Sequence, residues 1–572
     1  MKIINIHHVF AILLPLGFCN PLYSQPFVNI PDVNFYNALL SHGGLDKNEP
    51  FGLIDSLEAA NYAGVIDVSG KGITDMIGIE SFTSIGGLEC EYNKIDSLDL
   101  SMNSKLGSVT CNNNLLVWLK TPENISKIDC NNNKINLLDI SKSQKLSELY
   151  CNNNLIENLD LSGAPYIYRL ICDWNKLTNL NITGCKYINK LTCGVNQLTS
   201  LDVSACKDLV YLSCGSNQMP DLNVNGLTKL CTLYCGNNKI TNLDLSTNTA
   251  LIYFDCSINQ LTTLDVSANT AIYDLRCRNN LFTNLDFKNN PALFYLNCEF
   301  NVLTNLDISA NKALSFINCG HNKLSGLDLS GNDSLSYMVC WYNQLDTLDF
   351  SNNKAFTYLD CDSNLLTNLD FSANPLFYQL NCKNNLLTEL KFAPNSILIE
   401  LNCPSNKFTT LDFSTFKKMK YLDCIRNDSL EFVNISGATS LLRFDAYENP
   451  KLKCVQVDDV ESVKAKYNFR IDSTTSYSVD CAHLGVNENS DRSMFFVFPN
   501  PPNNVIKLQY YNNPTNFSYF IIYDFTGKII LKSELHSLKE EILINELRAG
   551  IYFYSLTDDG NVLKTGKLVI AR

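Results

Sequence analysis

The sequence predicts a β-rich solenoid, a right-handed superhelix with few helices outside an N-terminal cap, followed by a small antiparallel β-sandwich. Seventeen cysteines recur from Cys90 to Cys424, and each is followed three residues later by asparagine. The spacing is 21 residues, except for 19 residues between Cys111 and Cys130. Sixteen of the seventeen units also carry leucine eight residues after the cysteine. Such a period is typical of units that bury their apolar faces only against neighbours, so we expect about 17 to 19 coils.

A single unit shows how each coil is expected to run. Leu149 and Cys151 alternate with polar residues, which predicts a short strand with both side chains in the core. Cysteine acts there as a small hydrophobic residue. Asn154 follows where the chain leaves the strand, and its amide can satisfy backbone groups that the turn would leave unpaired. Residues 159–161, Leu-Asp-Leu, look extended, so the second half of the coil is predicted to lack a regular helix.

The repeat pattern as a whole resembles a known family. Residues 146–165 read L-x-x-L-x-C-x-x-N-x-I-x-x-L-D-L-S-x-A-P, which is similar to the 21-residue bacterial class of leucine-rich repeats. The similarity covers roughly residues 73–455. It implies an N-terminal cap over residues 25–86, a solenoid over residues 87–455, and a C-terminal cap and linker over residues 456–492. Residues 30–40 and 51–60 are expected to supply helices of the N-terminal cap.

In relatives, the N-terminal cap often carries a calcium loop of the form Asp-x-Asn-x-Asp-Gly that ends in Glu. Asp46, Asn48 and Glu58 match this pattern, but Pro50 and Phe51 replace the second Asp and the turn Gly, and one residue is inserted. Loss of a carboxylate and of the turn glycine favours a degenerate loop without metal.

The cysteine ladder is expected to consist of free thiols. Stacked positions lie about 4.7–4.9 Å apart with parallel side chains, whereas a disulfide needs Cβ atoms about 3.8 Å apart that point toward each other. A metal site needs about four ligands that converge on one point, and the leucines that lie between the ladder cysteines prevent such an arrangement. Cys185 and Cys206 lie on a turn, where both a bridge and free thiols are compatible with the sequence. Cys454 and Cys481 flank the end of the repeats and are candidates for a disulfide that closes the cap.

The two ends of the chain indicate export. Residues 1–24 combine Lys2, an apolar run and a small-residue exit, as in a signal peptide. A lipoprotein signal at Cys19 is the alternative, which the bulky Phe18 disfavours. Residues 493–572 contain Pro-Asn-Pro at 499–501, Asp524 with Gly527 and Lys528, Ala-Gly-Ile-Tyr at 549–552 and a terminal Lys-Leu-Val. This set resembles the type A sorting domain of the Bacteroidota type IX secretion system, and implies that secretion machinery as a partner and an extracellular or cell-surface location.

No catalytic constellation is present in the sequence, so we expect neither enzymatic activity nor a cofactor. The six histidines are scattered, and no phosphate-binding glycine loop or metal-binding histidine pair occurs. A net charge of −13 argues against nucleic acid as a partner, and no stretch after the signal is long and apolar enough to span a membrane. An aspartate nine residues after the cysteine recurs in most units, from Asp99 to Asp412. It is predicted to cap a turn, with weak cation binding as the alternative.

Aromatic side chains are expected to line the concave face of the middle repeats. They recur three residues before the ladder cysteine and just after it. Stiff, amphipathic aromatics in a row suit the binding of a protein or glycan, although tyrosine and phenylalanine also favour strands for stability alone. The sequence therefore favours a secreted or surface-displayed recognition protein, with a structural cell-surface spacer as the alternative. The candidate binding residues are Tyr253, Tyr295, Phe300, Phe316, Tyr337, Trp341, Tyr342 and Tyr358.

Overall fold

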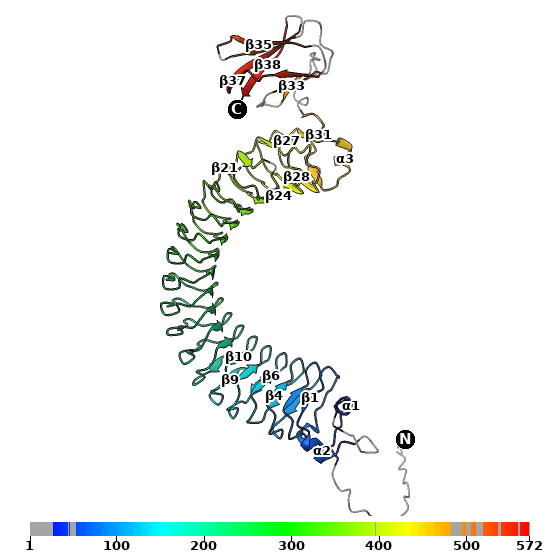
Figure 1. The fold of residues 1–572 in the computed structure, drawn as a ribbon, viewed down its shortest axis with the longest axis vertical. Helices are drawn as coiled ribbons and strands as arrows, with labels where there is room; N and C mark the ends of the chain where they lie inside the picture. The colour runs from blue at the N-terminus through cyan, green and yellow to red at the C-terminus, as the bar shows by residue number, and fades with distance from the viewer. Residues whose placement is uncertain are drawn as a thin grey trace, which may run out of the picture. The chain divides into compact units, whose positions relative to one another are not determined.

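A computed structural model describes residues 27–43, 45, 53–394, 396–481, 495–498, 505–510, 519–524, 526–535, 539–558 and 561–570. The chain divides into two compact units, Met1–Cys481 and Ala482–Arg572. The first unit is a curved β-solenoid with few helices (Figure 1), which confirms the predicted fold class. The predicted signal peptide and the calcium-loop positions Asp46, Asn48, Pro50 and Phe51 lie outside the described residues.

One parallel sheet of 20 strands runs the length of the solenoid and lies along the inner side of its curve (Figure 1). Each coil contributes one short strand, and neighbours pair in register, as Tyr295 does with Phe316. The strands, in spatial order, are β1 (Val65–Asp67), β2 (Gly87–Glu89), β4 (Ser108–Thr110), β6 (Lys127–Asp129), β8 (Glu148–Tyr150), β10 (Arg169–Ile171), β12 (Lys190–Thr192), β13 (Tyr211–Ser213), β14 (Thr232–Tyr234), β15 (Tyr253–Asp255), β16 (Asp274–Arg276), β17 (Tyr295–Asn297), β18 (Phe316–Asn318), β19 (Tyr337–Val339), β20 (Tyr358–Asp360), β22 (Gln379–Asn381), β24 (Glu400–Asn402), β26 (Tyr421–Asp423), β28 (Arg443–Ala446) and β30 (Phe469–Ile471).

The second half of each coil is also extended, as the Leu-Asp-Leu pattern predicted. Short parallel strands form there in both end regions of the solenoid. They are β3 (Ser97–Asp99), β5 (Trp118–Lys120), β7 (Leu137–Leu138), β9 (Asn158–Asp160), β11 (Asn179–Asn181), β21 (Asn368–Phe371), β23 (Glu389–Phe392), β25 (Thr410–Asp412), β27 (Phe432–Asn434), β29 (Cys454–Gln456) and β31 (Ser476–Ser478).

Helices are short and occur near the two ends of the solenoid. They are α1 (Val33–Leu40), α2 (Ser56–Asn61), the 3₁₀ turn η1 (Ile79–Ser81) and α3 (Val460–Lys464). Asp32 begins α1: its carboxylate accepts hydrogen bonds from the backbone of Asn34 and Phe35, and also from Thr74 in the first coils. A single side chain therefore both caps the helix and attaches it to the solenoid.

The ladder asparagines join successive coils. Nδ2 of Asn280 donates to the carbonyls of Cys256, Cys277 and Arg278, and its Oδ1 accepts from the backbone N–H of Leu261. The same pattern recurs along the ladder, so each amide satisfies backbone groups of its own coil and of the preceding one. All seventeen ladder cysteines are buried free thiols.

A second asparagine row, which the sequence analysis missed, lies thirteen residues after the cysteine. Asn290 is 1 % exposed and donates to the carbonyls of Val266 and Asn269 in earlier coils. Equivalent residues occur in the consecutive coils from Asn248 to Asn374. Cys185 and Cys206 occupy this same slot, and both are buried free thiols. The bridge that the sequence left open is therefore not formed.

The aspartate row caps turns. Oδ1 of Asp307, for example, accepts the backbone N–H of Ser309 at 3.0 Å, and the backbone and side chain of Ser309 lower the pKa of this carboxyl. The same contact to the residue two positions later occurs from Asp99 to Asp412. This agrees with the turn-capping interpretation. The aspartates are exposed, so solvent and salt screen the repulsion between neighbouring carboxylates of the row.

The second unit contains two antiparallel sheets, as expected of a small β-domain. One consists of β32 (Phe495–Phe498), β33 (Val505–Tyr510) and β36 (Lys539–Leu543), and the other of β35 (Ile529–Glu534), β34 (Tyr519–Tyr523), β37 (Gly550–Asp558) and β38 (Asn561–Ile570). Buried residues such as Ile506, Phe520 and Leu556 form a core separate from that of the solenoid.

Candidate functional site

Four aromatic side chains form a continuous stack on the concave sheet. Tyr295, Phe316, Tyr337 and Tyr358 stand on β17, β18, β19 and β20, three residues before the ladder cysteine. Their ring centroids lie 4.3, 4.9 and 4.0 Å apart, and successive ring planes differ by only 7°, 13° and 1°. Since each ring covers the faces of its neighbours, the stack presents ring edges and tyrosine hydroxyls outward.

A second aromatic group lies where the same strands end. The rings of Phe300 and His321 stack at 4.5 Å, and Tyr342 continues this row at 5.9 Å from His321. Trp341 meets Phe300, His321 and Tyr342 edge to face at 5.3 to 5.8 Å. We call these four residues and the stack of four together the aromatic surface.

Three members of this second group hold a strained backbone conformation. Phe300, His321 and Tyr342 have φ of 53°, 50° and 50°, in the left-handed region. The equivalent position has the same conformation in the other coils, where it holds asparagine in several cases, such as Asn237 and Asn279, and a bulky residue in others, such as Trp174 and Ile258. Asparagine tolerates this region, whereas a bulky residue there costs about 1–2 kcal/mol. Strand propensity does not account for large rings at a position outside the strand.

Polar side chains between the two aromatic groups are fixed by hydrogen bonds. Glu299 is 9 % exposed, and its carboxylate binds Arg278 at 3.3 Å and accepts from Nδ2 of Asn318 at 2.7 Å. Burial raises the pKa of Asp360, which accepts from the backbone N–H of Asp362. Burial also raises the pKa of Tyr358, so its hydroxyl stays protonated at neutral pH. The surface is preorganised and carries few free charges.

The structure brings seven of the eight predicted residues together and leaves Tyr253 apart. Asp274 and Arg276 of β16 lie between Tyr253 and Tyr295. Tyr253 instead contacts Tyr273, which stacks on Phe294 at 4.9 Å. The sequence analysis missed Tyr273 and Phe294, whose shared offset of four residues before the cysteine was the available signal.

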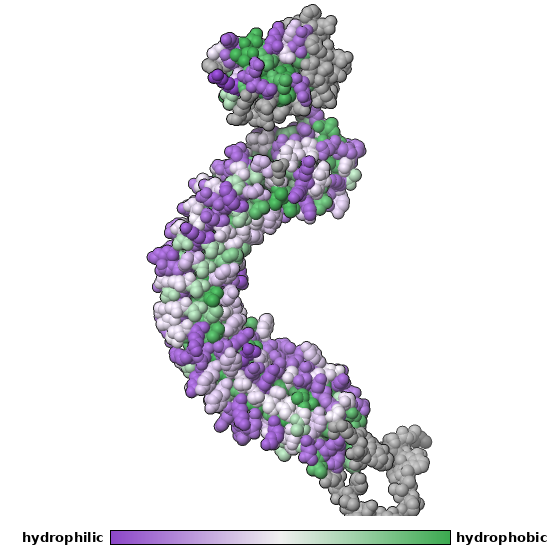
Figure 2. Space-filling model, viewed as in Figure 1, coloured by the Kyte–Doolittle hydropathy of each residue, from purple (hydrophilic) through white to green (hydrophobic). Residues whose placement is uncertain are grey.

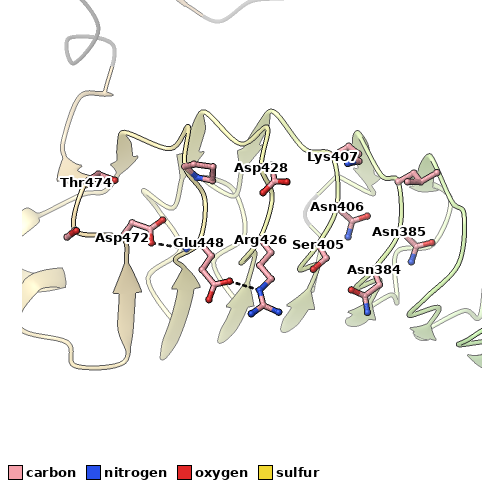
Figure 3. Close-up of a pocket in the computed structure, with 13 residues that line it drawn as sticks. Asn384, Asn385, Ser405, Asn406, Lys407, Arg426, Asp428, Glu448, Asp472 and Thr474 are labelled. Carbon is pink, nitrogen blue, oxygen red and sulfur yellow. Dashed lines mark hydrogen bonds and ion pairs between the residues drawn. The ribbon is translucent and has the colours of Figure 1, made fainter.

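A polar cavity of about 820 Å³ lies in the C-terminal coils (Figure 3). Arg426 pairs with Glu448 on its wall, and the Asp472 carboxylate accepts the backbone N–H groups of Glu448 and Asn449. These charged groups already have partners, so the cavity is a weaker candidate than the aromatic surface. The visible face of the solenoid in Figure 2 is largely hydrophilic, with paler and hydrophobic side chains gathered along its middle stretch.

Within the described part of the chain, no group of three His, Cys, Asp or Glu side chains is arranged to hold a metal ion. The described helices also include none that is long and apolar enough to cross a membrane. A disulfide joins Cys454 to Cys481, with 5.6 Å between the Cα atoms, and ties the last coils together.

Comparison with known proteins places both units. Residues 496–571 match the family model described as secretion system C-terminal sorting domain. No curated protein sequence matches the chain. Among solved structures, YopM from Yersinia enterocolitica is 24 % identical, with a TM-score of 0.61, over 68 % of this chain and 83 % of its own.

Two further solved structures are similar to the chain. The plant peptide hormone receptor RGFR1 in complex with RGF2 is 14 % identical, with a TM-score of 0.50, over 73 % of this chain and 81 % of its own. The functional domain of InlJ from Listeria monocytogenes, which includes a cysteine ladder, is 24 % identical, with a TM-score of 0.44, over 95 % and 97 %. The chain therefore combines a leucine-rich-repeat solenoid with a secretion system C-terminal sorting domain.

Proposed function

We propose that this is an exported recognition protein that binds a partner protein through the aromatic surface on its concave face. The observation that carries the proposal is the ring stacking over successive coils, in which Phe300, His321 and Tyr342 form a row beside the four stacked rings on β17–β20. His321 and Tyr342 are exposed, Phe300 is partly exposed, and all three lie outside the strands, so this row fits a binding role better than a purely stabilising one.

The ring geometry favours a protein over a glycan. Sugar rings bind aromatic side chains through the ring face, yet the faces of Phe316 and Tyr337 are covered by their neighbours on both sides. Exposed edges and hydroxyls, with fixed amides between them, suit the mixed apolar and polar surface of a protein. Tyrosine and tryptophan also supply much contact area at a low entropic cost.

The sorting domain supports export. A C-terminal domain of this family indicates secretion to the cell surface or beyond it. Cleavage of residues 1–24 as a signal peptide, followed by passage through the type IX machinery, is the route that we propose. In the alternative function, the repeats serve as a spacer without a specific ligand, and the aromatic surface only stabilises the coils.

Capture experiments separate these functions. Purified protein is compared with a variant in which Tyr295, Tyr337, Trp341, Tyr342 and Tyr358 are changed to Ser, on protein and glycan arrays. The matched control changes the exposed aromatics Tyr92, Tyr166 and Trp174, which lie outside the aromatic surface, to Ser. We expect protein ligands to be lost only in the first variant. Equal capture by both variants would contradict the proposal, and capture of glycans alone would reject the protein as ligand.

A further inference from the structure

Two arginines share one buried carboxylate at the C-terminal end of the concave sheet. Asp445 stands on β28 with its side chain only 1 % exposed. Nε of Arg443 donates to its Oδ2 at 2.6 Å, and Nη2 of Arg470 on β30 donates to the same oxygen at 2.8 Å. Arg470 also donates through Nε to Oδ1. Burial alone would raise the pKa of Asp445, but the two guanidinium groups lower it, so the carboxylate is ionised at neutral pH.

Two guanidinium groups share the single carboxylate of Asp445 as their hydrogen-bonded partner. Asp423 pairs with Asp445 across β26 and β28 and also attracts both arginines, although it forms no ion pair with either among the described residues. The second arginine therefore has no hydrogen-bonded carboxylate of its own.

Both guanidinium groups are held in place with donors to spare. The arginine side chains are 54 % and 48 % exposed. Arg470 lies over the ring of Tyr447, at 5.1 Å from its centroid. Within the described residues, the terminal nitrogens of Arg443 and Nη1 of Arg470 make no hydrogen bond. Planar donors fixed in this way match the geometry of a second carboxylate.

A hollow of about 750 Å³ opens beside these donors. Its lining combines both arginines with Asn468 and with the exposed apolar side chains of Tyr421, Leu442 and Tyr467. A group that carries both a carboxylate and an apolar portion would satisfy the arginines and cover these side chains. A smaller hollow shares Tyr421 and Arg443 with this one but is also lined by Glu400 and Asp423, whose carboxyl groups disfavour an anion there.

We propose that this hollow, which we call the arginine site, binds a carboxylate next to an apolar group on a partner protein, from either an acidic side chain or a chain terminus. It lies four strands beyond Tyr358, along β22, β24 and β26 to β28, which is about 19 Å at the usual strand spacing. The arginine site shares no residue with the aromatic surface, so the two proposals succeed or fail independently.

The first test uses a small probe on the full chain. Isothermal titration compares 3-phenylpropionate with its neutral isostere 3-phenylpropanamide. We expect saturable binding of the carboxylate and at least about tenfold weaker binding of the amide, since hydrogen bonds to charged groups contribute that much. Equal binding of the two compounds, or no binding of 3-phenylpropionate, overturns the proposal.

Variants locate the probe, and the first of them leaves both arginine partners of Asp445 in place. Leu442→Glu introduces a competing carboxylate at the rim of the hollow and should abolish binding of 3-phenylpropionate. The matched control is Leu281→Glu, since the two leucines are 55 % and 52 % exposed and Leu281 lies far along the chain. Arg443→Gln should weaken binding about ten- to hundredfold, with thermal denaturation as the check on folding. Unchanged binding in Leu442→Glu overturns the assignment to this hollow.

Peptides distinguish the two sources of the carboxylate. Acetyl-Gly-Gly-Phe is compared as free acid and as amide, alongside the amide of acetyl-Gly-Glu-Phe. Binding of the free acid alone assigns a chain terminus, and binding of the Glu-containing amide assigns an acidic side chain. Binding of none of the three peptides would count against recognition of a protein.

Discussion

Trp341 lies across the backbone of the preceding coil, where only glycine leaves room for it. A β-carbon on Gly320 would lie 2.6 Å from Nε1 of Trp341 and 2.8 Å from its Cδ1. The Gly320→Ala variant should therefore displace the indole from its contacts with Phe300 and His321. Because Trp341 is partly exposed and free to swing outward, we expect the free energy of unfolding to change by less than about 1 kcal/mol.

The expected result of Gly320→Ala is a shift in tryptophan fluorescence together with weaker capture of the partner. Gly326→Ala is the control, since no heavy atom lies within 4 Å of its β-carbon position. Unaltered fluorescence of the Gly320→Ala protein would show that the position of Trp341 does not depend on the absence of a side chain at residue 320.

At the scale of the element, the cysteine ladder should be chemically silent in the folded protein. Burial raises the pKa of Cys319 to about 12, and it also raises the pKa of the other ladder cysteines, such as Cys256. The thiolate is the reactive form, so among the described free cysteines of the folded protein at most Cys231, which is partly exposed, should react with a thiol reagent such as DTNB. After denaturation, all twenty free cysteines of the described residues should react. Rapid reaction of several thiols in native protein would contradict the buried ladder.

The helical cap should loosen in acid through Asp32. Burial acts to raise the pKa of Asp32, but donors from Thr74, Phe35 and Asp75 together lower it to about 2. A carboxyl with a lowered pKa stabilises the folded state above its unfolded value of about 3.9, and this contribution is lost as the pH falls toward 2. Protection of the α1 amides against hydrogen exchange, measured relative to their intrinsic rates at each pH, should therefore fall between about pH 4 and pH 2.

An Asp32→Asn variant provides the control for this pH effect. Its neutral amide cannot titrate, so protection of the α1 amides should be lower than in the native protein near pH 5 and should change less with acid. Identical pH profiles for the two proteins would show that titration of Asp32 does not cause the loss of protection in α1.

At the scale of the whole molecule, deletion of residues 495–572 should leave the solenoid folded. Coils interact only with their neighbours, and the disulfide Cys454–Cys481 lies within the retained part. We expect an unchanged melting temperature, with the truncated protein retained in the periplasm of a host that carries the type IX machinery. Normal amounts of truncated protein outside the cell would disprove the export role of the domain.

The repeated features of the fold could be predicted from the sequence because each recurs in most or all of the seventeen units. The strand just before Cys151, the bonding of Asn154 and the extended Leu-Asp-Leu all follow from local spacing. Non-repeated features could not be predicted in this way. The pairing of Arg443 and Arg470 with Asp445 depends on a register slip after Cys424, and the contact of Trp341 with Gly320 joins residues 21 positions apart. The position of an aromatic side chain was predictable, whereas the orientation of its ring was not.

The coil between Cys111 and Cys130 is two residues shorter than the 21-residue coils, yet β4 and β6 pair without any offset, Ser108 with Lys127. The strand of this shorter coil therefore presents its backbone donors and acceptors to the next strand in the usual register. A gene built of such units can gain or lose whole copies by unequal recombination, and the strands of the remaining coils would still pair with one another. The length of the solenoid can thus change in evolution in steps of one strand spacing, about 4.8 Å per coil.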